Sequence, residues 1–344
     1  MAAASNFRAL EATNRRETII LIAVFMLLFA ALGFGLDFAA RNLYLDNGHL
    51  AGFPALTIVA LIFGSIQSLI SFYGGASLVL LSVHARPLTA DTPKHQMVLN
   101  VINEMAIAAR MPAPKPYLMD DPSPNAFATG RDPKHSVICV TQGLVDNMDR
   151  EELQGVIGHE MSHVADYDIR TMMMIAVMVG GIAMLSDFVY RWMFFGGFSR
   201  RDRDNNERDG NAAALITVAV VILAAVAPLF SQLLAMAVSR QREYLADASS
   251  VEFTRNPRAL LRALQHIAQI ESPLKAGTAG TAHLFMVNPR EGLKDDNEGF
   301  FANLFSSHPP LQKRIERLQA MLGAAGAGTV AAEAARGATS SSSS

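Results

Sequence analysis

The chain has 344 residues, of which 51% are hydrophobic and only 17% are charged, whereas about a quarter are charged in an ordinary soluble protein. Its formal net charge of −2 argues against nucleic acid as a partner, and its single cysteine, Cys139, excludes a disulfide or a multi-thiolate metal site within one chain. We therefore expect a membrane protein in which any metal is held by histidines and carboxylates.

Four apolar stretches are long enough to cross a membrane, because each reaches the roughly 20 residues that a spanning helix needs. They lie at about residues 18–36, 53–83, 171–195 and 212–238. Arginines precede the first stretch, as in a signal peptide, but it is long, lacks a clean cleavage site and is soon followed by the second. We therefore interpret the first stretch as an uncleaved membrane anchor.

The distribution of lysine and arginine indicates the orientation of these stretches. The N-terminal tail, residues 1–17, is richer in arginine than the first loop, residues 37–52, so we expect the N-terminus in the cytoplasm. Two crossings return the basic segment 84–170 to the same side. The loop between the third and fourth stretches carries four arginines and four acidic residues, so a full crossing and a shallow hairpin both stay open.

The first cytoplasmic segment, residues 84–170, has the pattern of an α/β region. Apolar residues recur at helical spacing over residues 93–110, and Pro93 suits the first position of a helix. Short strands separated by turn residues are expected at residues 117–119, 126–129 and 137–141. After the fourth apolar stretch, residues 239–270 are again helical.

A second helix of this segment carries the motif on which the functional prediction depends. Asp149 and Glu152 have the spacing of a capping box and predict where the helix begins. His159 and His163 lie one turn apart on one face, where two imidazoles can bind one zinc ion. Glu160 can reach a water on that ion and remove its proton, because zinc lowers the pKa of the water towards neutrality. The helical context favours this interpretation over a chance match.

The third zinc ligand must come from another element, and Glu243 is the best candidate. Asp247 lies four residues later on the same helical face, where it could orient a histidine through the second ring nitrogen. A solvated ion-pair face with Arg240 and Arg242 is the alternative. His163 precedes the third apolar stretch and Glu243 follows the fourth. If both bind one zinc ion, these stretches form a hairpin and the metal lies near the cytoplasmic membrane surface.

At these residues the sequence resembles the HtpX family of bacterial membrane zinc peptidases, a branch of the group that contains the CAAX prenyl proteases. The resemblance covers about residues 18–318 and is more specific than the zinc motif alone, because several motifs occur in the same order. They are Ser123–Gly130, Gly158–His163, Arg242-Glu243 with Ala246-Asp247, and Ser307-His308-Pro309-Pro310 followed by Arg314 and Leu318.

The resemblance implies one zinc ion per chain in a gluzincin-type site, with Glu160 as the general base and with three ligands, His159, His163 and Glu243. It implies that Asn125 and Ala126 lie on an edge strand that pairs with an extended substrate, although the residues alone indicate a turn entering a strand. His308 and Arg314 resemble family positions near the active site. His308 could stabilise the oxyanion, and a structural role at the start of a helix is the alternative.

The predicted fold class is an α-helical multi-pass membrane protein with a mainly helical α+β, zincin-type cytoplasmic domain that carries a small sheet. The expected parts are a cytoplasmic tail (1–17), two transmembrane helices (18–83), a catalytic part with the zinc-binding helix (84–170), a hydrophobic hairpin (171–238), a catalytic part with the third ligand (239–322) and a disordered tail (323–344). The two catalytic parts must meet at the zinc ion.

The family implies an endopeptidase of the bacterial inner membrane, with its active site facing the cytoplasm, that degrades misfolded membrane proteins under stress. Its partners would be unfolded and membrane-protein substrates and the lipid bilayer, with an oligomer left open. Two alternatives remain. One is a specific processing protease akin to the prenyl-protein proteases, which four candidate spans make less favourable. The other is a non-enzymatic membrane protein with a degenerate zinc motif.

Overall fold

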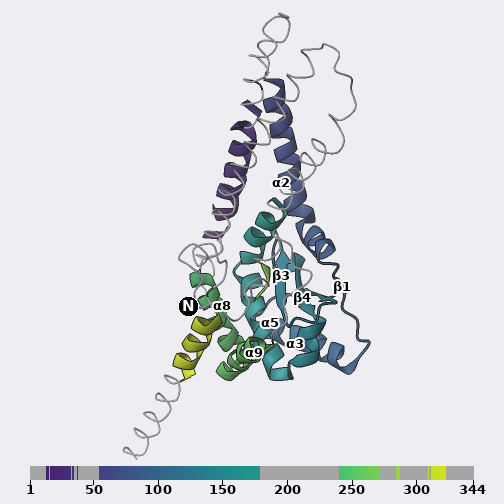
Figure 1. Ribbon diagram of the computed structural model, residues 1–344, viewed down its shortest axis with the longest axis vertical. Helices are drawn as coiled ribbons and strands as arrows, with labels where there is room; N and C mark the ends of the chain where they lie inside the picture. The colour runs from purple at the N-terminus through teal and green to yellow at the C-terminus, as the bar shows by residue number, and fades with distance from the viewer. Residues whose placement is uncertain are drawn as a thin grey trace, which may run out of the picture.

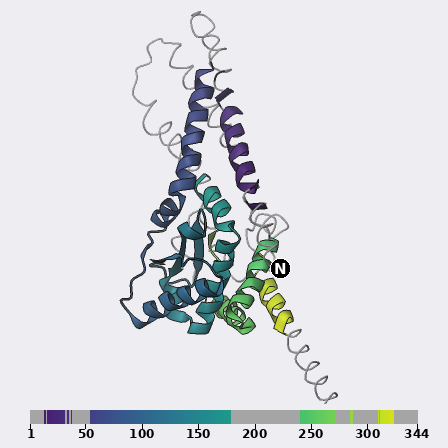
Figure 2. The ribbon, with the colours of Figure 1, turned by 180° about the vertical axis from the view of Figure 1, so that it is seen from behind.

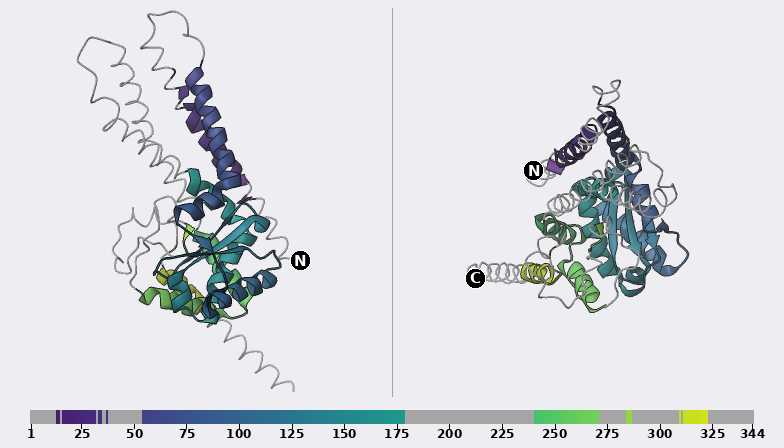
Figure 3. Two further views of the ribbon diagram at one scale, coloured as in Figure 1. Left: turned by 90° about the vertical axis from the view of Figure 1, so that its right-hand side faces the viewer. Right: turned by 45° about the horizontal axis from the view of Figure 1, so that its top comes forward.

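The computed structural model describes residues 13–14, 16–31, 33–34, 37, 54–178, 240–270, 284–286, 309 and 311–322. Two long helices project from one end, and the sheet with the other described helices lies at the opposite end (Figure 1). The view from behind and the side view show the same division (Figures 2 and 3). The expected tails at 1–17 and 323–344 lie largely or wholly outside the described residues.

The projecting helices are residues 16–31 and α2, Ala55–Ser82. Both expose large apolar side chains, as helices in contact with lipid do. Within the described ranges, one helical segment, Thr57–Ser82, is long and apolar enough to cross a membrane. The third and fourth apolar stretches lie outside the described residues beyond position 178, so a multi-pass topology stays a prediction.

Buried apolar side chains join the projecting helices to a helix at residues 168–178. Phe29 packs on Phe63 of α2 with 5.6 Å between ring centroids. Gly75 allows a close approach of the helix at residues 168–178 to α2, because a Cβ atom there would lie 2.9 Å from Cγ of Met173. The beginning of the third apolar stretch is therefore a helix that packs against α2.

A four-stranded sheet lies beside the helices that carry the motif. Its strands run in the order β1-β2-β4-β3, with β2 and β4 parallel and the other pairs antiparallel. The strands are β1 (Arg86–Pro87), β2 (Lys115–Met119), β3 (Ala126–Gly130) and β4 (Ser136–Thr141). The three expected strands are confirmed to within two residues. β1 is not among the expected strands, because a strand of two residues shows no alternation in the sequence.

The single cysteine belongs to the packing of this sheet. Cys139 lies in β4 opposite Phe127 of β3, and its side chain is buried. Burial raises the pKa of its thiol, because the charged thiolate loses its hydration. Phe127 also packs on Phe285, with ring centroids 5.1 Å apart. The cysteine is therefore a small apolar core residue.

The motif lies on a helix in the middle of the fold, α5, Arg150–Ala165. The predicted capping box is confirmed: Glu152 N donates to Asp149 Oδ1 at 2.9 Å, and Asp149 N donates to Glu152 Oε2 at 3.0 Å. α3, Pro93–Ala108, packs against α5 and matches the expected first helix. Almost every residue of α5 from Glu152 onwards is buried, so the motif faces protein on all sides.

The region after residue 239 is helical as expected but divides into α8, Arg240–Thr254, and α9, Pro257–Gln269. The break has a local cause, because Arg255 adopts a positive φ of 51° and Asn256 caps α9 by accepting a hydrogen bond from Arg258 N. Both helices pack on α5. A further helix at residues 311–322 completes the described fold.

Candidate metal centre and active site

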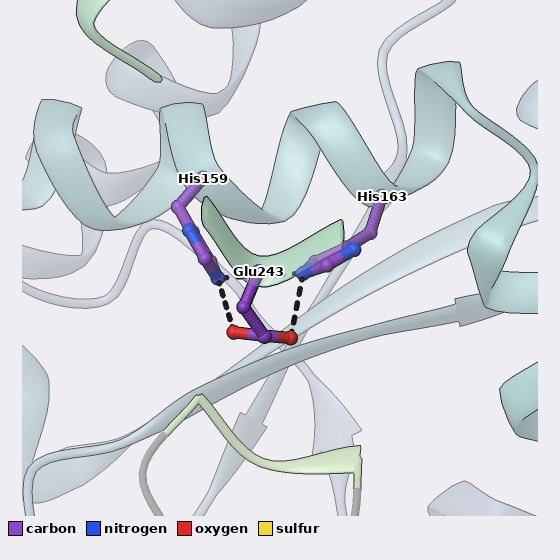
Figure 4. Close-up of side chains that lie close together, drawn as sticks. All are labelled: His159, His163 and Glu243. Atoms are coloured by element: carbon purple, nitrogen blue, oxygen red, sulfur yellow. Dashed lines mark hydrogen bonds and ion pairs between the residues drawn. The ribbon is translucent and has the colours of Figure 1, made fainter. Parts of the chain in front are cut away.

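Three predicted ligands from two helices converge at one point (Figure 4). His159 and His163 project from α5, and Glu243 reaches them from the first turn of α8. Nε2 of His159 lies 3.3 Å from Nε2 of His163, and the Glu243 oxygens lie 3.6 and 3.5 Å from these two nitrogens. All three residues are buried, so Glu243 does not belong to a solvated ion-pair face.

These distances fit a tetrahedral metal ion. Zinc binds histidine nitrogen and carboxylate oxygen at about 2.0 to 2.1 Å, so ligand atoms at tetrahedral corners are separated by roughly 3.3 to 3.4 Å. The Nε2–Nε2 separation of 3.3 Å matches this requirement. Each Nε2 faces its own Glu243 oxygen, at 3.6 Å for Oε2 and 3.5 Å for Oε1, so the carboxylate lies where it can supply the third ligand. Two imidazole nitrogens and one carboxylate, with a fourth corner open, are also a donor set that catalytic zinc sites use. The residues present therefore fit zinc.

A carboxylate faces the outer nitrogen of each histidine. Nδ1 of His159 lies 3.0 Å from Oδ1 of Asp247, and Nδ1 of His163 lies 3.1 Å from Oδ2 of Asp168. Both carboxylates are buried. A hydrogen on each Nδ1 satisfies them and leaves the Nε2 lone pairs directed at the metal position. Asp247 thus lies where the sequence analysis expected it, behind a ligand histidine.

Arg314 lies at the back of the same site, fully buried on the helix at residues 311–322. Its Nε and Nη2 donate to Asp247 at 3.1 and 2.6 Å, and its Nη1 donates to the Met286 carbonyl oxygen at 3.0 Å. Nη1 also lies 3.7 Å from Oε2 of Glu243. The guanidinium therefore places one fixed positive charge among the carboxylates of the site.

Electrostatics favour protons on the histidines when no metal is bound. Burial by itself would lower the pKa of His163, but the hydrogen bond to Asp168 and the charge of Glu243 raise it to about 9. The pKa of His159 is also raised, because Asp247 and Glu243 outweigh burial and the charge of Arg314. A metal ion bound here would have to displace these protons, because histidine binds a metal through an unprotonated nitrogen.

Glu160 follows His159 on α5, and its side chain is as fully buried as that of His159. Its negative charge contributes to the raised pKa of both His163 and Arg314, which places it within electrostatic reach of the metal position. The motif therefore supplies an acidic side chain next to the ligands in a setting from which bulk water is excluded.

The predicted substrate-binding residues lie at the start of the edge strand β3. Asn125 immediately precedes β3, and its carbonyl oxygen accepts a hydrogen bond from Thr141 N at 3.0 Å. The carbonyl oxygen of Ala126 points away from β4 and accepts from Met286 N at 2.9 Å. Among the described residues, Met286 thus already pairs with this edge at Ala126. His308, the candidate for stabilising the oxyanion, lies outside the described residues.

The sequence analysis missed one buried contact to the site. Asn14, from the N-terminal helix, donates to the Asp168 carboxylate that faces His163. Nothing in the local sequence marks Asn14, since its partner is 154 residues away.

The sequence profile of peptidase family M48 matches residues 93–322, which include every described site residue except Asn14. The chain belongs to peptidase family M48. The protease HtpX homologue of Lactobacillus helveticus is 40% identical over 314 residues, covering 90% of this chain and 98% of the relative. The homologue of Caldanaerobacter subterraneus is 38% identical and covers 91% of this chain and 97% of the relative. The homologue of Dictyoglomus thermophilum is 39% identical and covers 92% of this chain and 94% of the relative.

Among solved structures, the crystal structure of S. mikatae Ste24p aligns with 18% identity and a TM-score of 0.42, covering 90% of this chain and 66% of that chain. The predicted resemblance to the HtpX proteases is confirmed by the curated relatives. The chain is thus a metalloprotease of family M48, and the apolar helix α2 fits attachment to a membrane.

Proposed function

We propose that this M48 protein is a membrane-bound, zinc-dependent endopeptidase. The observation that carries the proposal is the convergence of His159, His163 and Glu243, which each offer one ligand atom within 4.8 Å of the others in a buried position. A bound zinc ion would supply a Lewis acid that lowers the pKa of a coordinated water and polarises the scissile carbonyl.

The residues of the chain perform the remaining work. Glu160 takes a proton from the attacking water and later delivers it to the leaving amine nitrogen, so the carboxylate is regenerated after each cleavage. Asp247 and Asp168 hold the rings of His159 and His163 in the orientation that directs Nε2 at the metal. These supports are buried and preformed, so little rearrangement is needed when substrate arrives.

The substrate is a polypeptide in extended form, which pairs with the outer edge of β3 beyond the position that Met286 occupies. Asn125 and Ala126 lie at the end of this edge near the site. Pairing through the backbone selects for extended chains rather than for a particular sequence, which suits unfolded proteins and exposed loops of membrane proteins. This supports quality control over dedicated processing of one substrate.

We place the enzyme in the bacterial inner membrane with the zinc site on the cytoplasmic side. Three observations support this placement. The relatives are HtpX protease homologues, α2 exposes apolar side chains, and the N-terminal tail carries arginines, which favour the cytoplasmic side. Protease protection of intact spheroplasts tests this placement. Degradation of residues 93–322 by an externally added protease would contradict it.

The deciding experiment compares wild type with Glu160→Gln, both purified in detergent and loaded with zinc. The variant keeps the ligands and the side-chain size, so it should retain one zinc ion per chain while cleavage of an unfolded test protein falls at least about a hundredfold. Glu151→Gln is the matched control, because Glu151 lies on the exposed side of the same helix. Equal cleavage by wild type and Glu160→Gln would refute the mechanism.

A further inference from the structure

The N-terminal helix makes a buried polar contact at the edge of the metal centre. Nδ2 of Asn14 donates to Oδ1 of Asp168 at 2.7 Å and also to the backbone oxygen of Asp166. The other oxygen of Asp168 lies 3.1 Å from Nδ1 of the ligand His163. Asn14 and Asp168 are each 3% exposed, so water does not replace this contact. One carboxylate thus connects a zinc ligand to a residue from the N-terminal helix.

The amide of Asn14 fits its surroundings in one orientation only. Its nitrogen faces two acceptors, the Asp168 carboxylate and the Asp166 carbonyl, whereas its oxygen lies 3.2 Å from Nη1 of Arg242. Turning the amide round would bring oxygen against oxygen and nitrogen against guanidinium. Aspartate could accept from Arg242 but could not donate to Asp168. The position therefore requires a side chain that both donates and accepts.

Asn14 and Asp168 also contact Arg242, the residue immediately before the third proposed ligand, Glu243. Nη1 of Arg242 donates to Oδ1 of Asp168 at 3.3 Å, and Nη2 donates to Oε2 of Glu17 at 2.6 Å. The N-terminal helix therefore contacts the supports of His163 on one side and the helix turn that carries Glu243 on the other. Arg242 and Asp168 are largely buried, whereas Glu17 is half-buried at the edge of this contact.

We propose that Asn14 is a positioning residue of the zinc site, which makes the N-terminal helix part of the active centre. By fixing Oδ1 of Asp168, its amide leaves Oδ2 directed at Nδ1 of His163, so the ring cannot turn away from the metal. This inference rests on the proposed zinc site, and it concerns a residue outside the region 93–322 that the family profile covers. Zinc binding then depends on the Asn14 side chain as well as on the three ligands.

The test uses full-length enzyme in detergent and three readouts: zinc affinity by chelator competition, the visible spectrum of the cobalt-substituted protein, and kcat and KM on an unfolded protein. Asn14→Leu removes donor and acceptor at similar size, whereas Asn14→Asp keeps the acceptor for Arg242 and removes the donor. Ile20→Leu, at an exposed site on the same helix, is the control that should match wild type.

Asn14→Leu should weaken zinc binding about tenfold, the lower end of the 10- to 100-fold range for residues that support a metal ligand. It should also change the cobalt bands and lower kcat more than it raises KM. Asn14→Asp should be at least as severe, because it brings a second carboxylate to Asp168. Wild-type affinity and spectrum in Asn14→Leu would overturn the inference, as would full function in Asn14→Asp.

A second variant separates positioning from simple docking of the helix. Thr18 lies one turn further along; its Oγ1 donates to the backbone oxygen of Asn14 at 2.9 Å and lies 3.2 Å from Oγ1 of Thr171, and neither contact involves the Asn14 side chain. Thr18→Val should lower thermal stability but leave the cobalt spectrum unchanged. If it changed the spectrum as Asn14→Leu does, the effect would come from docking alone and the specific role of Asn14 would be refuted. Absence of zinc from the wild type would instead refute the proposed function.

Discussion

Arg314 and Asp247 form a fully buried ion pair directly behind His159, one of the proposed zinc ligands. Nε and Nη2 of Arg314 donate to the two oxygens of Asp247 at 3.1 and 2.6 Å, and Oδ1 of Asp247 faces Nδ1 of His159 at 3.0 Å. The Asp247 charge raises the pKa of Arg314, and Arg314 lowers that of Asp247, although burial acts against both. The pair therefore stays ionised in the core.

Replacing Arg314 by alanine should be strongly destabilising. It leaves the Asp247 carboxylate buried without its main counter-charge, a change that typically costs about 3 to 5 kcal/mol. Thermal unfolding of metal-free enzyme in detergent measures the effect. Arg317→Ala is the control, because Arg317 lies on the exposed face of the same helix and stacks on Tyr244, a contact worth roughly 1 kcal/mol. Equal effects of the two variants would contradict the assigned role.

Asp166 should make stability fall as pH rises between about 4 and 6. Burial, with the nearby charge of Asp168, raises its pKa from 3.8 to about 6. The folded state therefore keeps the proton over a range in which the unfolded chain has already lost it, and ionising the buried group at higher pH costs stability. Asp166→Asn removes this cost and should stabilise the protein at pH 7 by about 1 to 3 kcal/mol.

The measurement for Asp166→Asn is the melting temperature of the metal-free variant relative to wild type at pH 4.5 and pH 7. The advantage of the variant should shrink at the lower pH, where wild-type Asp166 is protonated. Asp146→Asn changes an exposed carboxylate and should show little difference at either pH. An advantage of Asp166→Asn that is independent of pH would mean that its carboxyl group titrates normally.

Gly155 should not accept even one methyl group. A Cβ atom there would lie 2.4 Å from the backbone nitrogen of Leu260, so α9 would have to move away from α5. Gly155→Ala should therefore destabilise the enzyme by at least about 1 to 3 kcal/mol. Gly74→Ala is the matched control on α2, where a Cβ atom meets nothing within 4 Å. That variant should be neutral or slightly stabilising in thermal unfolding, because alanine favours a helix.

Local signals in the sequence predicted the elements that carry the site. The capping box at Asp149 and Glu152 and the spacing of His159 and His163 depend on residues within one or two turns, so they could be read without knowing the fold. The break at Arg255 was not visible, because helical periodicity continues on both sides of a single residue with positive φ.

Contacts between distant parts of the chain could not be predicted in this way. Asp247 and Arg314 are 67 residues apart, and their pairing depends on how α8 packs against the helix at residues 311–322. The link from Asn14 to Asp168 spans 154 residues. Such polar contacts have no periodicity, so resemblance to a family can name the residues but only the three-dimensional arrangement shows which atoms meet.

The burial of Cys139 makes the protein its own reporter of unfolding. Because this is the only thiol in 344 residues and burial raises its pKa, alkylating reagents cannot reach a reactive thiolate while β3 and β4 stay paired. The rate of labelling at neutral pH then measures how often the sheet opens. The same probe would show, without added dyes or new cysteines, whether zinc and the N-terminal helix keep the catalytic part closed.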